Sequence, residues 1–203
     1  AVLSVVDACI ATLGKMAGRV LQYLYEEVGV FPLHQVCKRK GSFRVLQALV
    51  KALCVAGLFH VTSHVNKAGD TPLALAARVG ELESVKLLLQ FEPKSAIFHT
   101  NSNSGDGVLH EAVMGGSCEV MKVLCHALGS DVTEYCLAGN KAGISPLQLA
   151  FALGHCEQAA LLDAPVGRRR RVVVDDGAVR AGAGDGLEAG AAIVLAARAQ
   201  FAQ

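Results

Sequence analysis

Residues 71–89 read TPLALAARVGELESVKLLL and predict two short helices joined at a glycine. The hydroxyl of Thr71 can cap the first helix, and Pro72 suits the first helical turn, where its missing N–H is not needed. Gly80 is expected to end this helix, because glycine readily adopts the left-handed backbone of a helix C-terminus. Apolar residues then recur at three- and four-residue spacing over 82–89, which predicts a second, antiparallel helix.

The same pattern occurs four times along the chain. The copies begin at Phe31, Thr71, Gly107 and Ser145, and their aligned glycines are Gly41, Gly80, Gly116 and Gly154. The spacings between these glycines are 39, 36 and 38 residues. One helix pair alone leaves an apolar face uncovered, so the repetition predicts that neighbouring copies pack on one another.

These copies resemble the ankyrin repeat, whose hallmark is T-P-L-H-x-A at a period of about 33 residues. The resemblance rests on Thr71 to Leu73, on His34 and His110 after the Pro-Leu position, and on Ala76 and Ala77. It implies an all-α fold, an ankyrin-repeat α-solenoid of stacked antiparallel helix pairs with turn fingers. It also implies that His34 and His110 form hydrogen bonds within and between repeats.

The turn fingers of the resemblance fall in polar segments before the repeats. Asn66–Gly69 and Asn140–Gly143 both read NKAG, with asparagine where aspartate is usual, and Ser102–Gly105 fits more weakly. The first copy departs from the pattern, since it has one extra residue before Gly41. Copies one to three have longer connections than the family norm, which predicts fingers of unequal length.

Three segments follow from this alignment. Residues 1–30 are predicted to be a degenerate N-terminal helix pair or capping repeat, and residues 31–163 the domain of four repeats. Residues 164–203 are rich in Ala, Gly and Arg and are predicted to be a flexible tail. Within that tail, Arg168–Arg171 is compatible with nuclear import, against the simpler interpretation of a solvated linker.

Composition narrows the classes of function. The chain has 19 basic and 18 acidic residues, so no overall field attracts nucleic acid or an anionic membrane. Trp is absent and aromatic residues make up 5%, which argues against an aromatic-lined pocket for a small molecule. We expect no cofactor, no small-molecule substrate, no membrane insertion and no nucleic-acid partner, and we expect a monomer.

Cysteines and histidines, seven of each, are the residues that would favour catalysis or metal binding. Cys118 and Cys156 fall two residues after a repeat glycine and are predicted to be small core residues. His60 and His64 have the spacing of a helical metal pair, but no third ligand accompanies them. We therefore predict no catalytic and no metal site. Seven scattered cysteines without paired spacing favour reduced thiols and an intracellular, most simply cytoplasmic, protein.

The resemblance implies a protein–protein interaction module or scaffold, whose concave face of turn tips and first helices binds a partner. Transferred position by position, the predicted partner-binding residues are Lys38, Arg39, Lys67, Asp70, Arg78, Asn103, Asp106, Met114, Lys141 and Ile144. Two alternatives remain open from the sequence. The chain can be the regulatory ankyrin portion of a larger enzyme or channel, or a hydrolase that uses Cys and His.

Overall fold

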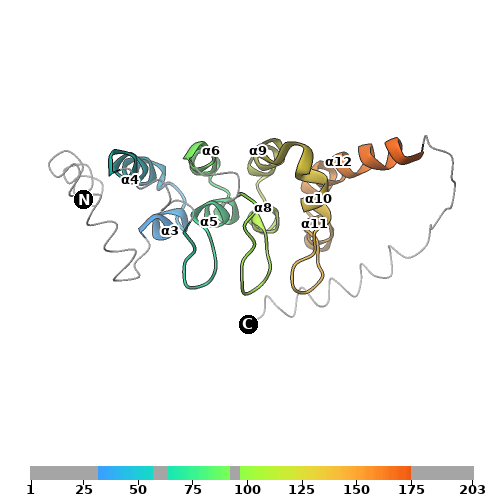
Figure 1. Cartoon of the computed structure of the whole chain (residues 1–203), viewed down its shortest axis with the longest axis horizontal. Coiled ribbons are helices and arrows are strands. Elements are labelled where there is room, and N and C mark those ends of the chain that lie inside the picture. Colours follow the sequence, from blue (N-terminus) through green and yellow to red (C-terminus); the bar gives the residue numbers. More distant parts are fainter. Residues whose placement is uncertain (1–31, 57–63, 92–96, 175–203) are drawn as a thin grey trace. The chain divides into compact units, whose positions relative to one another are not determined.

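The computed structural model describes residues 32–56, 64–91 and 97–174 of the chain. It divides into two units, residues 1–103 and 104–203, which are treated separately below. The predicted N-terminal helix pair lies outside the described residues, as does the tail beyond residue 174. The helices of the described residues are labelled in Figure 1.

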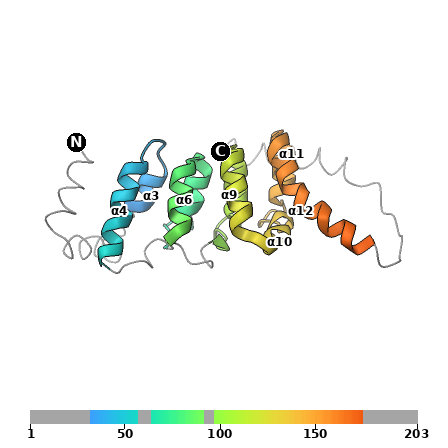
Figure 2. The ribbon, with the colours of Figure 1, turned by 90° about the horizontal axis from the view of Figure 1, so that it is seen from above.

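The first unit contains two helix pairs. Helices α3 (Pro32–Cys37) and α4 (Phe43–Ala56) form one pair, and α5 (Pro72–Val79) and α6 (Leu82–Phe91) form the other. Helix α3 packs against α5, and α4 against α6, so the two pairs lie side by side (Figures 1 and 2). Leucines fill the space between them, and Leu33, Leu46, Leu53, Leu73 and Leu88 are all almost fully buried.

The second unit repeats this arrangement with one addition. Helices α8 (Val108–Gly115) and α9 (Cys118–Leu128) form its first pair, and α11 (Pro146–Leu153) and α12 (Cys156–Val174) its second. Between them lie a short 3-10 helix, η3 (Gly129–Asp131), and helix α10 (Val132–Leu137), which packs on α12. The all-α helix-pair fold predicted from the sequence is confirmed in the described residues, whose assigned elements are all helices.

The helix boundaries follow the chemistry of the repeat. The Thr71 side chain accepts a hydrogen bond from the Ala74 N–H at 3.2 Å, and Pro72 opens α5. The repeat glycines Gly41, Gly80, Gly116 and Gly154 all have φ between 71° and 74°, the left-handed region. The predicted N-cap at Thr71 and the glycine ends of α5, α8 and α11 are therefore confirmed.

Loss of one of these caps should have a measurable cost. Ser145 Oγ accepts from the Gln148 N–H at 3.2 Å, and the Ser145 N–H donates to Gln148 Oε1 at 2.9 Å. We expect Ser145→Ala to lower the free energy of unfolding by about 1 kcal/mol in urea titrations. Ser145→Thr keeps the hydroxyl and should stay close to wild type. Equal losses in both variants would contradict the capping role.

The extra residue of the first copy shortens its first helix. Helix α3 ends at Cys37, and the chain turns over Lys38–Gly41 before α4 begins. The Ser42 hydroxyl donates to the carbonyls of Val36 and Arg39 at 2.7 and 2.6 Å. This side chain satisfies carbonyl groups that the end of a helix otherwise leaves without partners.

Two segments differ from the sequence-based expectation. The long connection after the third copy forms η3 and α10, so its extra length is used in helix packing and not in a longer finger. Helix α12 continues to Val174, past the predicted start of the tail at residue 164, and its backbone includes Arg168–Arg171. Pro165 lies inside this helix and leaves the carbonyl four residues earlier without its usual donor.

Among the described residues, helices that combine the length and the apolar character needed to cross a bilayer are absent.

Candidate partner-binding surface

Each finger is a loop built around an asparagine side chain. In the first unit, Asn66 Oδ1 accepts from the N–H groups of Ala68 and Asp70 at 2.8 and 3.0 Å. The Asn66 N–H in turn donates to the Asp70 carbonyl at 3.0 Å. Gly69 adopts φ +83°, which lets the loop reverse direction. The predicted turn at Asn66–Gly69 is thus a closed, hydrogen-bonded loop.

The loop before α11 has the same construction in the second unit. Asn140 Oδ1 accepts from the N–H groups of Ala142 and Ile144 at 3.0 and 3.1 Å. The Asn140 N–H donates to the Ile144 carbonyl at 2.9 Å, and Gly143 has φ +75°. The two NKAG segments therefore form one structure twice.

The weaker match at Ser102–Gly105 has a simple cause. Its framing asparagine is Asn101, whose Oδ1 accepts from the Asn103 N–H at 2.7 Å. This loop has one more residue between its asparagine and Gly105 than the other two have. The fingers therefore differ by one residue, a smaller difference than the long connections suggested.

Aspartates at the base of the fingers accept hydrogen bonds from asparagines of the next finger. Asn101 Nδ2 donates to Asp70 Oδ1 at 2.6 Å within the first unit. Asn140 Nδ2 donates to Asp106 Oδ1 at 2.8 Å within the second. The same amide–carboxylate bond therefore connects successive fingers in each unit.

This connection changes the interpretation of three residues predicted to contact a partner. Asp70 and Ile144 are each 7% exposed, so they support the finger from inside and present almost no surface. Asp106 is half-buried and holds Asn140. The transfer used loop position alone, whereas burial leaves Asp70 and Ile144 with little surface to offer a partner.

The histidines hold the fingers to the first helices, as the resemblance implied. His34 Nε2 donates to the carbonyls of His64 and Asp70, each at 3.0 Å. His110 Nδ1 accepts from the Gly107 N–H at 3.1 Å, and its Nε2 donates to the Ile144 carbonyl at 2.9 Å. Both ring nitrogens of His110 therefore have roles that only the neutral ring can fill.

Burial keeps both rings neutral. Desolvation lowers the pKa of His34 from 6.5 to about 4, although the two carbonyl acceptors act in the opposite direction. Desolvation also lowers the pKa of His110. These histidines have a structural role in the repeat as neutral rings. Because burial lowers their pKa values, acid favours the unfolded chain, in which the rings can be protonated.

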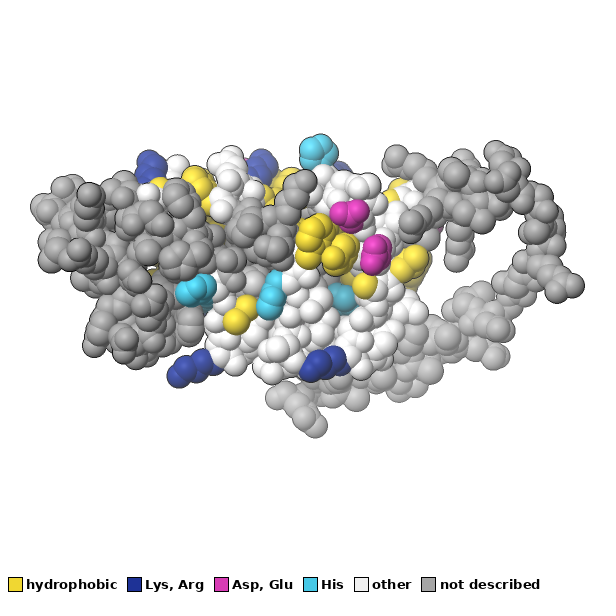
Figure 3. All heavy atoms as spheres, viewed as in Figure 1, with side chains coloured by type: hydrophobic (Ala, Val, Ile, Leu, Met, Phe, Trp, Pro, Cys, Tyr) yellow, Lys and Arg dark blue, Asp and Glu magenta, His cyan; other side chains and the backbone are white. Residues whose placement is uncertain are grey.

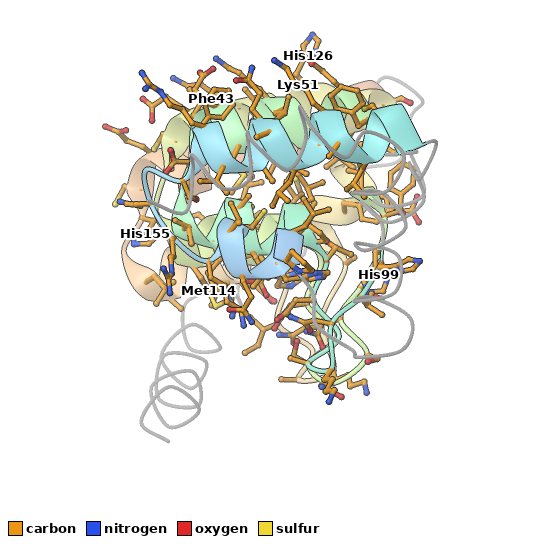
Figure 4. The ribbon with its side chains drawn as sticks, turned by 90° about the vertical axis from the view of Figure 1, so that its left-hand side faces the viewer. Phe43, Lys51, His99, Met114, His126 and His155 are labelled. Carbon is orange, nitrogen blue, oxygen red and sulfur yellow. The ribbon has the colours of Figure 1, made fainter. Side chains whose placement is uncertain are left out.

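The remaining predicted residues lie near or on the surface. Lys38, Arg39, Lys67, Arg78, Asn103 and Lys141 are exposed, and Met114 is half-buried. Figure 3 places basic side chains at the loop tips along its lower edge. Met114, which is labelled in Figure 4, lies one residue before the end of α8. The Asn103 amide also donates to the Ala68 carbonyl at 2.9 Å, so this residue is partly structural.

Four cysteines of the described residues have a raised pKa, the opposite of what an activated nucleophile needs. Desolvation raises the pKa of Cys54, of Cys125 to about 11 and of Cys136 to about 12. Burial, followed by the hydrogen bond to Glu157, raises the pKa of Cys118. A catalytic thiol needs a lowered pKa, so these four are poor candidates for catalysis.

The prediction that Cys118 and Cys156 are core residues was wrong. Cys156 is exposed, and Cys118 is half-buried with its Sγ 3.3 Å from Glu157 Oε2. Both occupy the first position of a second helix, where the side chain lies at the edge of the helix pair. The described residues hold no cluster of three or more potential metal ligands. Of the two histidines with the spacing of a metal pair, His60 lies outside the described residues.

Sequence reasoning missed one exposed aromatic side chain. Phe151 on α11 is 65% exposed, whereas Ala77 and Val113 at the aligned positions are fully buried. In the second unit, α8 is covered by α11, the first helix of the next repeat. Helix α11 belongs to the last repeat of the pattern, so Phe151 has no first helix of a following repeat to cover it among the described residues. The signal in the sequence was the end of the repeat pattern after residue 162, combined with an aromatic residue at a packing position.

A family model described as "Ankyrin repeats (3 copies)" matches residues 33–136 of the chain. The match covers about half of the 203 residues and includes the first three helix pairs. The fourth pair lies beyond it, yet α11 has the same capped start and glycine end as α5. No curated protein sequence matches the chain at a significant level.

Proposed function

This chain belongs to the ankyrin-repeat family, and from that premise we propose that it binds another protein through the finger face of its units. The finger face comprises the three loops Asn66–Asp70, Asn101–Asp106 and Asn140–Ile144 and the exposed sides of the first helices. Ankyrin repeats generally serve as protein-binding modules, and catalysis is not typical of them. Fold alone is an associational argument, so the proposal needs support from the surface itself.

One observation carries the proposal: each NKAG loop is internally hydrogen-bonded yet presents an exposed lysine at its tip. Lys67 and Lys141 occupy the second position of their loops, beside a framing asparagine whose side chain makes two backbone hydrogen bonds. A rigid loop loses little backbone freedom on binding, so the entropic cost is confined mainly to its exposed side chains. Exposed lysines on rigid loops are therefore better suited to binding a partner than to packing within the repeats.

The test compares two charge reversals of equal size. Lys67→Glu with Arg78→Glu alters the finger face, and Lys51→Glu with Lys122→Glu alters exposed positions on the second helices α4 and α9. We expect the first pair to weaken capture of a partner from lysate by tenfold or more, and the second to leave it near wild type.

Circular dichroism and urea midpoints of both variants establish that they remain folded. Equal capture by the wild type and the finger-face variant, quantified by mass spectrometry, would contradict the proposal. So would a loss that the second-helix variant shares.

A further inference from the structure

Charge is distributed very unevenly along the repeats. Residues 32–103 carry nine Lys and Arg against four Asp and Glu, a formal charge of +5. Residues 104–165 carry two against seven, a formal charge of −5. The near-neutral chain therefore combines a basic first unit with an acidic stretch of the second, and local fields are much stronger than the net charge of +1 suggests.

Five of these nine basic residues lie at one end of the two first helices of the first unit. Lys38, Arg39 and Lys40 follow the C-terminus of α3, Arg44 lies in the first turn of α4, and Arg78 lies near the C-terminus of α5. All five are exposed. We call this group the basic corner.

Contacts between the repeats keep the basic corner together. Helices α3 and α5 pack on each other, and the Gly41 N–H donates to Glu81 Oε2 at 2.9 Å across the two repeats. Glu81 is thus a carboxylate of the chain already bound within the corner. On α6, Glu83 pairs instead with Lys86 at 3.0 Å. The Glu81 carboxylate therefore connects the turn that carries Lys38, Arg39 and Lys40 to the second repeat.

We propose that the basic corner binds an acidic segment of the partner protein, which rests on the proposed function and specifies the chemistry of that partner. Arg and Lys side chains form charge-assisted hydrogen bonds with carboxylates, and the Arg fork can bind one in two places.

A protein segment fits better than a nucleic acid. A long polyanion has many more charges than the five cations of the corner can bind. The rest of the chain would not attract it, because residues 104–165 carry a formal charge of −5 and the net charge of the chain is only +1. A short acidic segment needs only the few cations that the corner supplies. Its binding should weaken steeply with salt, because exposed charges are screened within about 8 Å at physiological ionic strength.

The test titrates the full chain against a fluorescein-labelled peptide of alternating glutamate and serine, with fluorescence anisotropy as the measurement. We expect the peptide to bind, its glutamine analogue not to bind, and affinity to fall about tenfold or more in Arg39→Glu with Arg44→Glu. The matched control is Lys51→Glu with Lys122→Glu, which makes the same charge change at exposed positions of the second helices, outside the corner and the fingers. Lys51 lies farther along α4 than Phe43, which marks the start of that helix in Figure 4.

Each outcome is decisive. Arg44→Glu places an acid in the first turn of a helix, where it is favourable, so loss of fold is not expected and circular dichroism checks it. No binding of the acidic peptide, or equal losses in the two double variants, would overturn the inference. Tighter binding of a single-stranded oligonucleotide of the same charge would overturn it in favour of a nucleic acid. If the acidic peptide does not bind while capture of a partner still depends on the finger face, only the present inference fails. If the peptide binds while capture does not depend on the finger face, the proposed function is rejected.

Discussion

Glutamine in place of His34 is expected to remove the contribution of this histidine to the acid sensitivity of the first unit. In the wild type, the unfolded chain takes up a proton near pH 6.5 and the folded chain only near pH 4. Between these values the unfolded state binds more protons, so stability rises with pH over this window and is lost as the pH falls. Below pH 4 both states are protonated and the loss is complete.

The expected loss is about 3 kcal/mol in total for His34, taken from the difference between the two pKa values. Urea midpoints are measured from pH 7 to pH 4 on the wild type and on His34→Gln. The difference between the two curves gives the contribution of His34, because the carboxylates titrate in both proteins and their effect is subtracted. Glutamine is a suitable replacement because Gln148 occupies the aligned position of the fourth repeat and accepts the same N-cap N–H that His110 accepts in the third.

Two further variants complete this test. His110→Gln should act in the same direction in the second unit, since burial also lowers the pKa of His110. His126→Gln, at an exposed histidine of α9, is the matched control and should keep the wild-type dependence on pH. If His34→Gln loses as much stability on acidification as the wild type, the buried neutral histidine does not explain the acid response.

Alanine at Gly105 is expected to destabilise the second unit by about 3 kcal/mol. Gly105 has φ +77°, which costs a Cβ-bearing residue about 1 kcal/mol or more by itself. A Cβ there would also lie 2.7 Å from the Lys141 backbone nitrogen, closer than real Cβ contacts. Because the obstacle is backbone of the next finger, it cannot rotate away as a side chain can.

Gly143 supplies the matched control for this prediction. It has nearly the same φ of +75°, but a Cβ would meet no atom within 4 Å. Gly143→Ala should therefore show the conformational cost alone, about 1 to 2 kcal/mol. Urea unfolding of the two variants separates close finger packing from backbone strain. Equal losses would mean that the fingers at Gly105 and Lys141 are not in contact in solution.

The sequence predicted the parts of the fold that single residues determine. Thr71 and Ser145 cap helices through a hydroxyl, and Gly80 and Gly154 end them in the left-handed region, because these roles depend on local backbone chemistry. The family motif added the histidine hydrogen bonds. Each of these features acts within one repeat or between neighbours at a fixed spacing.

The features that escaped prediction depend on packing between distant segments. The burial of Asp70 depends on Asn101 in the following finger, and that of Ile144 on the helices behind it. Helix α10 packs on α12, and this contact cannot be predicted from the local sequence pattern of either segment. Cys156 sits at an edge position, and alignment with leucine at residue 82 could not distinguish edge from core.

Photo-crosslinking from chosen surface positions tests most directly the central claim that a partner protein occupies the finger face. A photoreactive residue is placed at 67 or 141 on the fingers and, for comparison, at 51 or 122 on the second helices. The account predicts that a foreign protein is crosslinked from position 67 or from position 141, and not from 51 or 122. Crosslinks to that protein from the second helices, with none from the fingers, would contradict the account.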